Sequence, residues 1–188
     1  MPPLRLFIAV DTPPEIKASM AGLRDTLKRS DADVRWESEE KFHITLKFLG
    51  DTDPELLPHF VPLLEGVAAR RQPIGIRYSG LGCFPHVRDP RVIWVGVEDP
   101  SGDLVALQHQ IDAGCLSLGV PVEQKAFHAH VTLGRVKSRR NLRSLLATME
   151  SATFDGRSAT ITAVILMKSD LKPGGSVYTT LKRFPLHM

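Results

Sequence analysis

The sequence is poor in the residues that build disulfide or metal scaffolds. Its two cysteines, Cys83 and Cys115, stand far apart and form no Cys-x-x-Cys pair, so neither a disulfide-stapled secreted domain nor a zinc ribbon is expected. No stretch reaches the roughly 20 apolar residues that a membrane span requires. The opening MPPLRLFIAV lacks the layout of a signal peptide. We therefore expect a cytoplasmic protein with no membrane partner.

The chain also lacks a strong charge bias. Its formal net charge is only +3, with 43% hydrophobic and 24% charged residues, which is the range of soluble globular proteins and excludes a disordered or collagen-like chain. At 188 residues it is long enough to bury a substantial core. We expect residues 1–188 to form a single bilobed domain, and a monomer by default.

Apolar residues recur at two different spacings along the chain. Helical spacing predicts four helices, which begin near Thr12, Asp53, Ser101 and Leu142, the first with a capping box from Thr12 to Glu15. The strand candidates are residues 4–10, 42–49, 74–78, 92–97, 129–136, 159–167 and 177–184. Residues 80–90 and 172–175 are expected to be loops. The mixture predicts an α+β or α/β fold.

One short internal repeat stands out. His43-Ile44-Thr45-Leu46 and His130-Val131-Thr132-Leu133 share the pattern His-x-Thr-Leu about half a chain apart. Each copy lies in a predicted strand with a helix downstream. The repeat therefore predicts two pseudo-symmetric lobes.

Strand alternation gives the repeat a chemical meaning. Residues i and i+2 share a face, which groups His43 with Thr45 and Lys47. The same alternation groups His130 with Thr132, and also with His128. Each strand is thus expected to present an imidazole beside a hydroxyl, with Phe48 on the opposite face.

Two imidazoles in one site suit acid and base catalysis at phosphorus. The ordinary imidazole pKa of about 6.5 allows both protonation states near neutral pH. Threonine hydroxyls can donate to phosphate oxygens, and a nearby lysine or arginine can offset their charge. A single strand histidine is more often a packing or surface residue, and two copies with matched alternation favour a shared site. A metal site is the rival interpretation, but the sequence offers no HExxH motif and no third ligand, so no metal is expected.

Two tryptophans are further candidates, because an indole can stack on a nucleobase. Trp94 lies within the apolar run 92–97 and is expected in the core. Trp36 precedes a polar stretch and stays undecided.

The sequence resembles the RNA 2',3'-cyclic phosphodiesterases, also named 2'-5' RNA ligases, of the two-histidine (2H) phosphoesterase superfamily. The resemblance covers nearly the whole chain. It rests on the paired motifs and on the surrounding stretches 5–10, 42–50, 127–135 and 183–186. It implies an α+β bilobed fold in which antiparallel sheets line a central cleft, with helices packed outside and no cofactor.

The resemblance also implies a reaction. The family opens an RNA 3'-terminal 2',3'-cyclic phosphate to a 2'-phosphate, and the reverse reaction joins tRNA halves through a 2'-5' bond. By this resemblance His43 is the proton donor to the leaving 3'-oxygen and His130 the acceptor from water. Thr45, Thr132 and Arg135 bind the phosphate.

Two departures and two alternatives accompany this interpretation. Ala129 stands where family members often have proline, and strict alternation would turn Arg135 away from His130 unless Gly134 hosts a bulge. The alternatives are a 2H phosphodiesterase for another small cyclic phosphate or 2'-5' linked nucleotide, and an RNA-binding module that catalyses nothing. The intact His-x-Thr pairs count against the module.

Overall fold

A computed structural model describes residues 2–187, which form nine strands and four α-helices. The strands are β1 (Leu4–Asp11), β2 (Val34–Trp36), β3 (His43–Thr52), β4 (Ile74–Phe84), β5 (Val92–Glu98), β6 (His130–Val136), β7 (Arg157–Ile161), β8 (Ala163–Lys172) and β9 (Gly175–Pro185). The helices are α1 (Pro14–Lys28), α2 (Leu57–Ala68), α3 (Asp103–Leu116) and α4 (Leu142–Ser151), with 3-10 turns η1 (Glu39–Lys41) and η2 (Pro54–Leu56).

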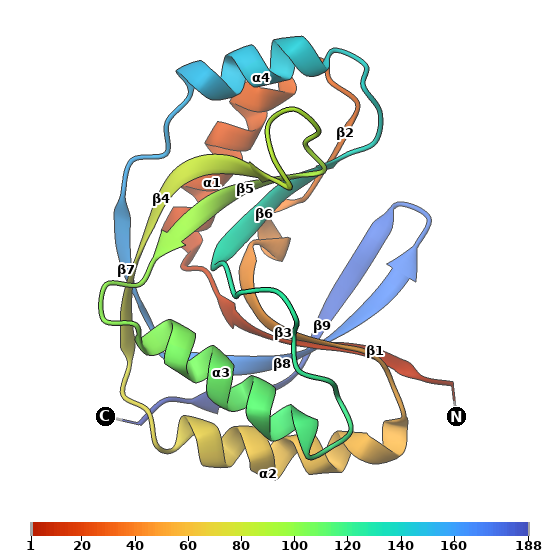
Figure 1. Cartoon of the computed structure of the whole chain (residues 1–188), viewed down its shortest axis with the longest axis vertical. Coiled ribbons are helices and arrows are strands. Elements are labelled where there is room, and N and C mark those ends of the chain that lie inside the picture. The colour runs from red at the N-terminus through yellow and green to blue at the C-terminus, as the bar shows by residue number, and fades with distance from the viewer. Residues whose placement is uncertain (1, 188) are drawn as a thin grey trace.

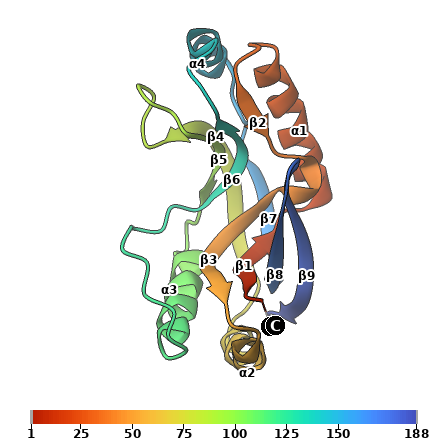
Figure 2. The ribbon, with the colours of Figure 1, turned by 90° about the vertical axis from the view of Figure 1, so that its right-hand side faces the viewer.

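All nine strands belong to one antiparallel sheet. Its order is β7-β4-β5-β6-β3-β1-β8-β9, and β2 pairs with β6 outside this path. The sheet curls into a half-barrel, so that its two ends form the walls of a concave face (Figures 1 and 2). The strand order is pseudo-symmetric about the central β6–β3 pair. The outer neighbour of each of these two strands comes earlier in the chain, namely β5 beside β6 and β1 beside β3. The predicted α+β fold with two pseudo-symmetric lobes is confirmed.

The helices cover the outside of the two lobes in two pairs. α2 and α3 pack together below β1, β3 and β8, whereas α1 and α4 pack together beside β4, β5 and β6 (Figures 1 and 2). Each half of the chain thus sends one helix to each lobe. One cluster of buried side chains runs through both lobes and includes Leu6, Phe60, Leu107 and Leu145. No helix within residues 2–187 has the length and apolar character to cross a membrane.

The structure corrects three predictions of local structure. The predicted strand 159–167 is two strands divided at Thr162, because β7 pairs with β4 in one lobe whereas β8 pairs with β1 in the other. β4 continues to Phe84 through the predicted loop, since Gly80, with φ of 78°, allows a register shift in place of a turn. β2 was not predicted at all.

The predicted capping box at the start of α1 is also wrong. Pro13 occupies the N-cap position, and no side chain caps the helix. The Thr12 hydroxyl instead accepts a hydrogen bond from the buried Tyr78 hydroxyl at 3.3 Å. This hydrogen bond therefore links the segment before α1 to β4.

Candidate active site

The two His-x-Thr-Leu motifs meet where the lobes join. β3 and β6 pair through Ile44 and Val131, which hold the same place in the two motifs. A pseudo-twofold axis therefore passes between them. Both residues are fully buried in the core, so alternation turns the histidine before each of them to the concave face.

This pairing brings each histidine beside the other motif's threonine. Continued antiparallel register from the Ile44–Val131 pair sets His43 across from Thr132 and His130 across from Thr45. Two imidazoles and two hydroxyls thus gather in one region of the sheet.

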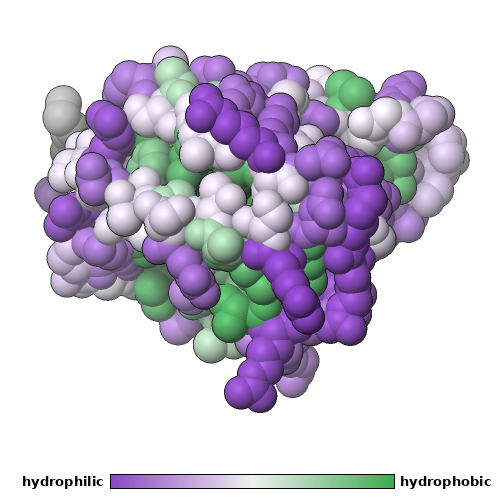
Figure 3. Space-filling model, turned by 90° about the horizontal axis from the view of Figure 1, so that it is seen from above, coloured by the Kyte–Doolittle hydropathy of each residue, from purple (hydrophilic) through white to green (hydrophobic). Residues whose placement is uncertain are grey.

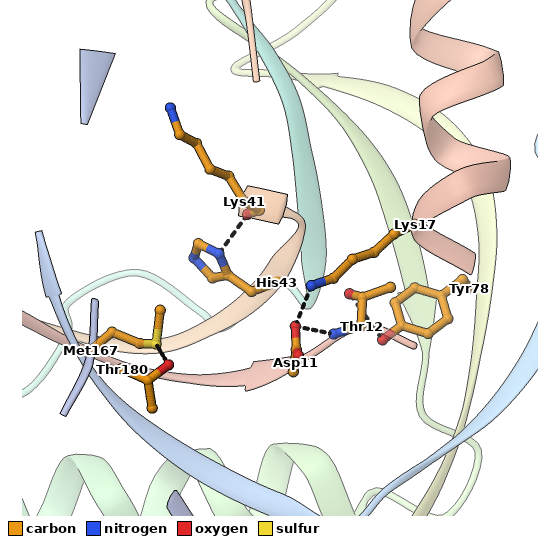
Figure 4. A network of polar contacts seen from close by, with 8 residues as sticks. All are labelled: Asp11, Thr12, Lys17, Lys41, His43, Tyr78, Met167 and Thr180. Carbon is orange, nitrogen blue, oxygen red and sulfur yellow. Dashed lines mark hydrogen bonds and ion pairs between the residues drawn. The ribbon is translucent and has the colours of Figure 1, made fainter. Parts of the chain in front are cut away.

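Both imidazoles are held in the same way. The Nδ1 atom of His43 lies 2.6 Å from the carbonyl oxygen of Lys41 (Figure 4), and Nδ1 of His130 lies 2.7 Å from that of His128. Because a carbonyl only accepts, Nδ1 carries the hydrogen in each ring. Nε2 is therefore the nitrogen that can exchange a proton with a ligand. In His43 it lies 3.1 Å from the hydroxyl of Thr45.

Burial lowers the pKa of both imidazoles. It lowers the pKa of His43 from 6.5 to about 4, although the Lys41 carbonyl and the carboxylate of Asp11 act in the opposite direction. A proton on His130 lowers the pKa of His43 further. Burial is also the main cause that lowers the pKa of His130, and the charges of His128 and Arg135 add to it. A bound anion would reverse this effect, because it favours the protonated ring.

A carboxylate and an ammonium group flank His43 (Figure 4). Asp11 is the register partner of His43 on β1. Its Oδ1 lies 2.7 Å from Nζ of Lys17 and accepts from the backbone N–H of Thr12. The two charges act on the His43 pKa in opposite directions, so the ion pair reduces the effect of either charge alone.

Matching register shifts change the alternation just after each threonine. The pairing of β3 with β1 skips Leu46, and the pairing of β6 with β5 skips Leu133. These are the last residues of the two motifs. Each shift is a bulge that reverses which face the following residues occupy.

The bulge at Leu46 overturns the prediction for the next two residues. Lys47 does not join His43 on the concave face: it is 5% exposed and forms a hydrogen-bonded ion pair with Asp112 of α3. Phe48 does not enter the core and is 61% exposed. Its register partner on β1 is Phe7, and the two rings lie 6.3 Å apart.

The bulge in β6 settles the direction of Arg135. The pairing skips Leu133, not Gly134, and sets Arg135 opposite Val92, two residues from Trp94 on β5. Trp94 pairs with Thr132, so Arg135 shares the concave face with the threonine.

Glu37 is a site residue that the sequence did not reveal. Its carboxylate lies 3.9 Å from Nε of Arg135 and 3.8 Å from Nζ of Lys41, and its side chain is 13% exposed. The segment after β2 carries it, and its backbone N–H donates to the carbonyl of Leu133. A carboxylate on Nε leaves the outer nitrogens of the guanidinium available to a ligand.

Aromatic rings flank each histidine. Phe7 and Tyr178 lie 5.1 and 5.4 Å from the His43 ring, and Phe84 lies 5.0 Å from His130. Tyr178 comes from β9, and burial raises the pKa of its hydroxyl, as does the charge of Glu37. The sequence reasoning missed Tyr178, because nothing local ties β9 to the first motif.

Trp94 lies on the concave face and not in the core as predicted. Its indole lies over Gly82, its register partner on β4, and a Cβ added at this glycine would overlap the ring. The ring packs against Phe84 and His128 at 5.2 and 4.9 Å. His128 is exposed beside His130, with 6.2 Å between the rings, and its carbonyl is what orients His130. Trp36 is half-buried against the core through β2.

Other charged groups lie away from the motifs. Exposed basic residues follow β6 at the α4 end of the molecule, namely Lys137, Arg139, Arg140 and Arg143. Seen from that end, the surface is mainly hydrophilic, with apolar side chains showing in the hollows (Figure 3). Across residues 2–187, His, Cys, Asp and Glu side chains form no group of three that could hold a metal ion.

Comparison with known proteins gives one consistent family. The model of the LigT-like phosphoesterase family matches twice, over residues 10–94 and 95–178. An RNA 2',3'-cyclic phosphodiesterase of Methanothermobacter thermautotrophicus is 34% identical over 97% of this chain and 99% of its own length. The corresponding protein of Methanocaldococcus jannaschii is 32% identical over 96% and 100%.

Solved structures agree with this assignment. A crystal structure from Thermus thermophilus superposes with a TM-score of 0.83 at 29% identity, covering 97% of both chains. The structure of Escherichia coli LigT complexed with 3'-AMP superposes with a TM-score of 0.80 at 27% identity, covering 99% of both. The two family-model matches each contain one His-x-Thr-Leu motif, as the pseudo-symmetry of the sheet requires.

Proposed function

This chain belongs to the LigT-like phosphoesterase family, and on that basis we propose that it hydrolyses RNA 3'-terminal 2',3'-cyclic phosphates to 2'-phosphates by metal-independent catalysis with two histidines. The observation that carries the proposal is the pairing of Ile44 with Val131, which places the two His-x-Thr pairs about one axis. The names of the relatives supply the substrate class.

In this mechanism the two Nε2 atoms act on opposite sides of the phosphorus, one on the attacking water and the other on the leaving 3'-oxygen. Water attacks the phosphorus as Nε2 of His130 accepts its proton. The bond from phosphorus to the 3'-oxygen breaks, and Nε2 of His43 donates its proton to that oxygen. The product carries a 2'-phosphate and a free 3'-hydroxyl, and the two histidines have exchanged protonation states.

The remaining groups stabilise the charge on the phosphate. The hydroxyls of Thr45 and Thr132 donate to non-bridging oxygens, and Arg135 offsets their negative charge from the concave face. The Thr45 hydroxyl lies 3.1 Å from Nε2 of His43 and forms a hydrogen bond with it. A bound phosphate would take that hydroxyl and free the nitrogen.

The assigned roles require His43 to be protonated when the substrate is bound. Burial, which lowers the pKa of His43 to about 4, opposes this. The negative charge of a cyclic phosphate beside the ring favours the protonated form. Substrate binding and proton uptake at the histidine pair are therefore coupled.

The site needs no second copy of the chain, because both motifs come from one polypeptide, and we propose a monomer. The free thiols of Cys83 and Cys115 suit a reducing cytoplasm. The reverse reaction, 2'-5' ligation of RNA ends such as tRNA halves, follows from the same chemistry, and the abundance of water favours hydrolysis.

The test is turnover of an oligonucleotide with a 2',3'-cyclic phosphate end, with and without EDTA. We expect conversion to the 2'-phosphate at equal rates in both conditions. Loss of activity under EDTA that a divalent ion restores would contradict the metal-independent mechanism. Binding without product would favour a non-catalytic module, and exclusive turnover of mononucleotide cyclic phosphates or 2'-5' linked dinucleotides would favour the alternative substrates.

A further inference from the structure

Glu37 puts a negative charge beside the arginine that the proposed function assigns to the phosphate. Its carboxylate lies 3.9 Å from Nε of Arg135 and 3.8 Å from Nζ of Lys41. Both distances exceed the length of a hydrogen bond, so the carboxylate acts on these cations through its charge. A carboxylate in this place reduces the attraction of both cations for an anionic ligand.

The backbone of Glu37 fixes the position of this charge. Its N–H donates to the carbonyl of Leu133 at 2.8 Å, and its carbonyl accepts from Nη1 of Arg24 at 2.9 Å. The side chain is 13% exposed, whereas that of Arg135 is 43% exposed. The guanidinium is therefore the more accessible of the two groups, and salt screens the partly buried carboxylate less than it screens an exposed one.

The charge of Glu37 also acts near the histidine of the other motif. Burial is the main cause that raises the pKa of Tyr178, and Glu37 raises this pKa further, whereas Arg135 lowers it. The Tyr178 ring lies 5.4 Å from that of His43. The carboxylate and the guanidinium thus influence the same region as the first imidazole.

The fixed charges around the histidines leave a small positive excess. The carboxylate and ammonium that flank His43 form an ion pair and cancel (Figure 4). Arg135, Lys41 and Glu37 together leave a net charge of +1. A cyclic phosphodiester carries one negative charge, whereas a phosphate monoester carries about −1.5 to −2 at pH 7. The excess therefore matches the substrate of the proposed reaction better than its product.

We propose that Glu37 is a specificity-determining residue that discriminates between the singly charged cyclic phosphate and the more highly charged 2'-phosphate. This inference rests on the proposed function, which supplies both RNA ends. Coulomb energy is proportional to the charge of the ligand, so the carboxylate weakens binding of the product more than binding of the substrate. Glu37 thereby promotes product release and limits product inhibition.

The experiment compares three ends of one short RNA that differ in charge, namely a 2',3'-cyclic phosphate, a 2'-phosphate and a neutral 2',3'-diol. KM is measured for the first, and the other two are measured as competitive inhibitors of its turnover. E37Q removes the charge and keeps the shape of the side chain. Coulomb's law at the dielectric constants of protein surfaces gives roughly a 3- to 10-fold change per ligand charge. We expect E37Q to lower KM by this factor, to lower the inhibition constant of the 2'-phosphate by about its square, and to leave that of the diol unchanged.

Two further variants separate charge from structure. E39Q removes the same charge from Glu39, an exposed residue of η1, and should leave all three constants within about twofold because water and salt screen this group. E37D keeps the charge and should keep the wild-type ratio between the inhibition constant of the 2'-phosphate and KM. An unchanged constant for the diol also shows that a variant is folded.

The sign of the change decides between two roles of Glu37. Weaker binding of both phosphate ends by E37Q would mean that Glu37 serves to hold Arg135 in place, and would overturn the discrimination by charge. Unchanged constants, an equal change for both phosphate ends, or the E37Q ratio in E37D would overturn it as well, and all of these results leave the proposed function intact. Absence of turnover of the cyclic phosphate by the wild-type protein would overturn both proposals.

Discussion

The pH dependence of kcat/KM is the sharpest test of the histidine pair. This parameter reports the protonation states of the free enzyme. Burial lowers the pKa of His43 to about 4 and also lowers that of His130. Productive turnover needs one proton on the pair, so kcat/KM should follow a bell whose two limbs both lie below pH 6.5.

The expected size of the effect follows from these values. An imidazole with a pKa of about 4 is protonated in only about 1 molecule in 300 at pH 6.5. With both apparent pKa values below 6.5, kcat/KM at pH 7.5 should be about a tenth of its maximum or less, and should fall tenfold for each further pH unit. The limbs belong to the coupled pair and not to single residues.

The profile of kcat should differ in a defined direction. Bound phosphate places a negative charge beside both rings and raises their pKa values. The alkaline limb of kcat should therefore lie at higher pH than that of kcat/KM. The assay is chromatographic separation of the cyclic-phosphate oligonucleotide from its 2'-phosphate product at constant ionic strength.

Two matched variants sharpen this measurement. H128A removes a charge that lowers the pKa of His130, so it should move a limb of kcat/KM to higher pH. H59A replaces an exposed histidine of α2 and should leave the profile unchanged. A flat profile, or an alkaline limb of kcat/KM above pH 7 in the wild-type protein, would refute the reasoning from burial.

Four further outcomes are expected. H43A and H130A should each lower kcat by about 10²- to 10⁴-fold in single-turnover assays, and the double variant by less than the product, because both groups serve one displacement. K47A leaves the buried Asp112 without its ion-pair partner and should lower the free energy of unfolding in urea by about 3–5 kcal/mol. K168A breaks an ion pair between two partly exposed side chains and should lower it by about 1 kcal/mol or less; equal losses would contradict the buried pair. G82A forces a Cβ into the ring of Trp94 and should lower both stability and kcat, while G22A in α1 meets no atom within 4 Å and should be neutral or stabilising by up to about 1 kcal/mol. Finally, each helix pair draws one helix from either half of the chain, and the core is shared by both lobes, which supports our proposal of a single domain. Far- and near-UV circular dichroism should therefore report one coincident unfolding transition, and two separated transitions would count against a single domain.

Local patterns in the sequence determined much of the fold. Helical spacing of apolar residues located all four helices, because a helix that covers a sheet must bury one face. Alternation located most strands, and the repeated His-x-Thr-Leu motif predicted two related lobes. Ile44 and Val131, next to the two histidines, are buried, as the alternation of side chains between the two faces of a strand predicted.

Tertiary structure decided what lies beyond the motifs. Alternation predicts a side chain's face only while the ladder is uninterrupted, and a bulge depends on how the neighbouring strand pairs. For this reason Lys47 and Phe48 were assigned to the wrong faces and the direction of Arg135 stayed open. Tyr178 reaches His43 of the first motif from β9, and Glu37 reaches Arg135 from the segment after β2, through contacts between segments far apart in the sequence. The sequence thus determined which residues could perform the chemistry, and strand pairing between distant segments decided which others surround them.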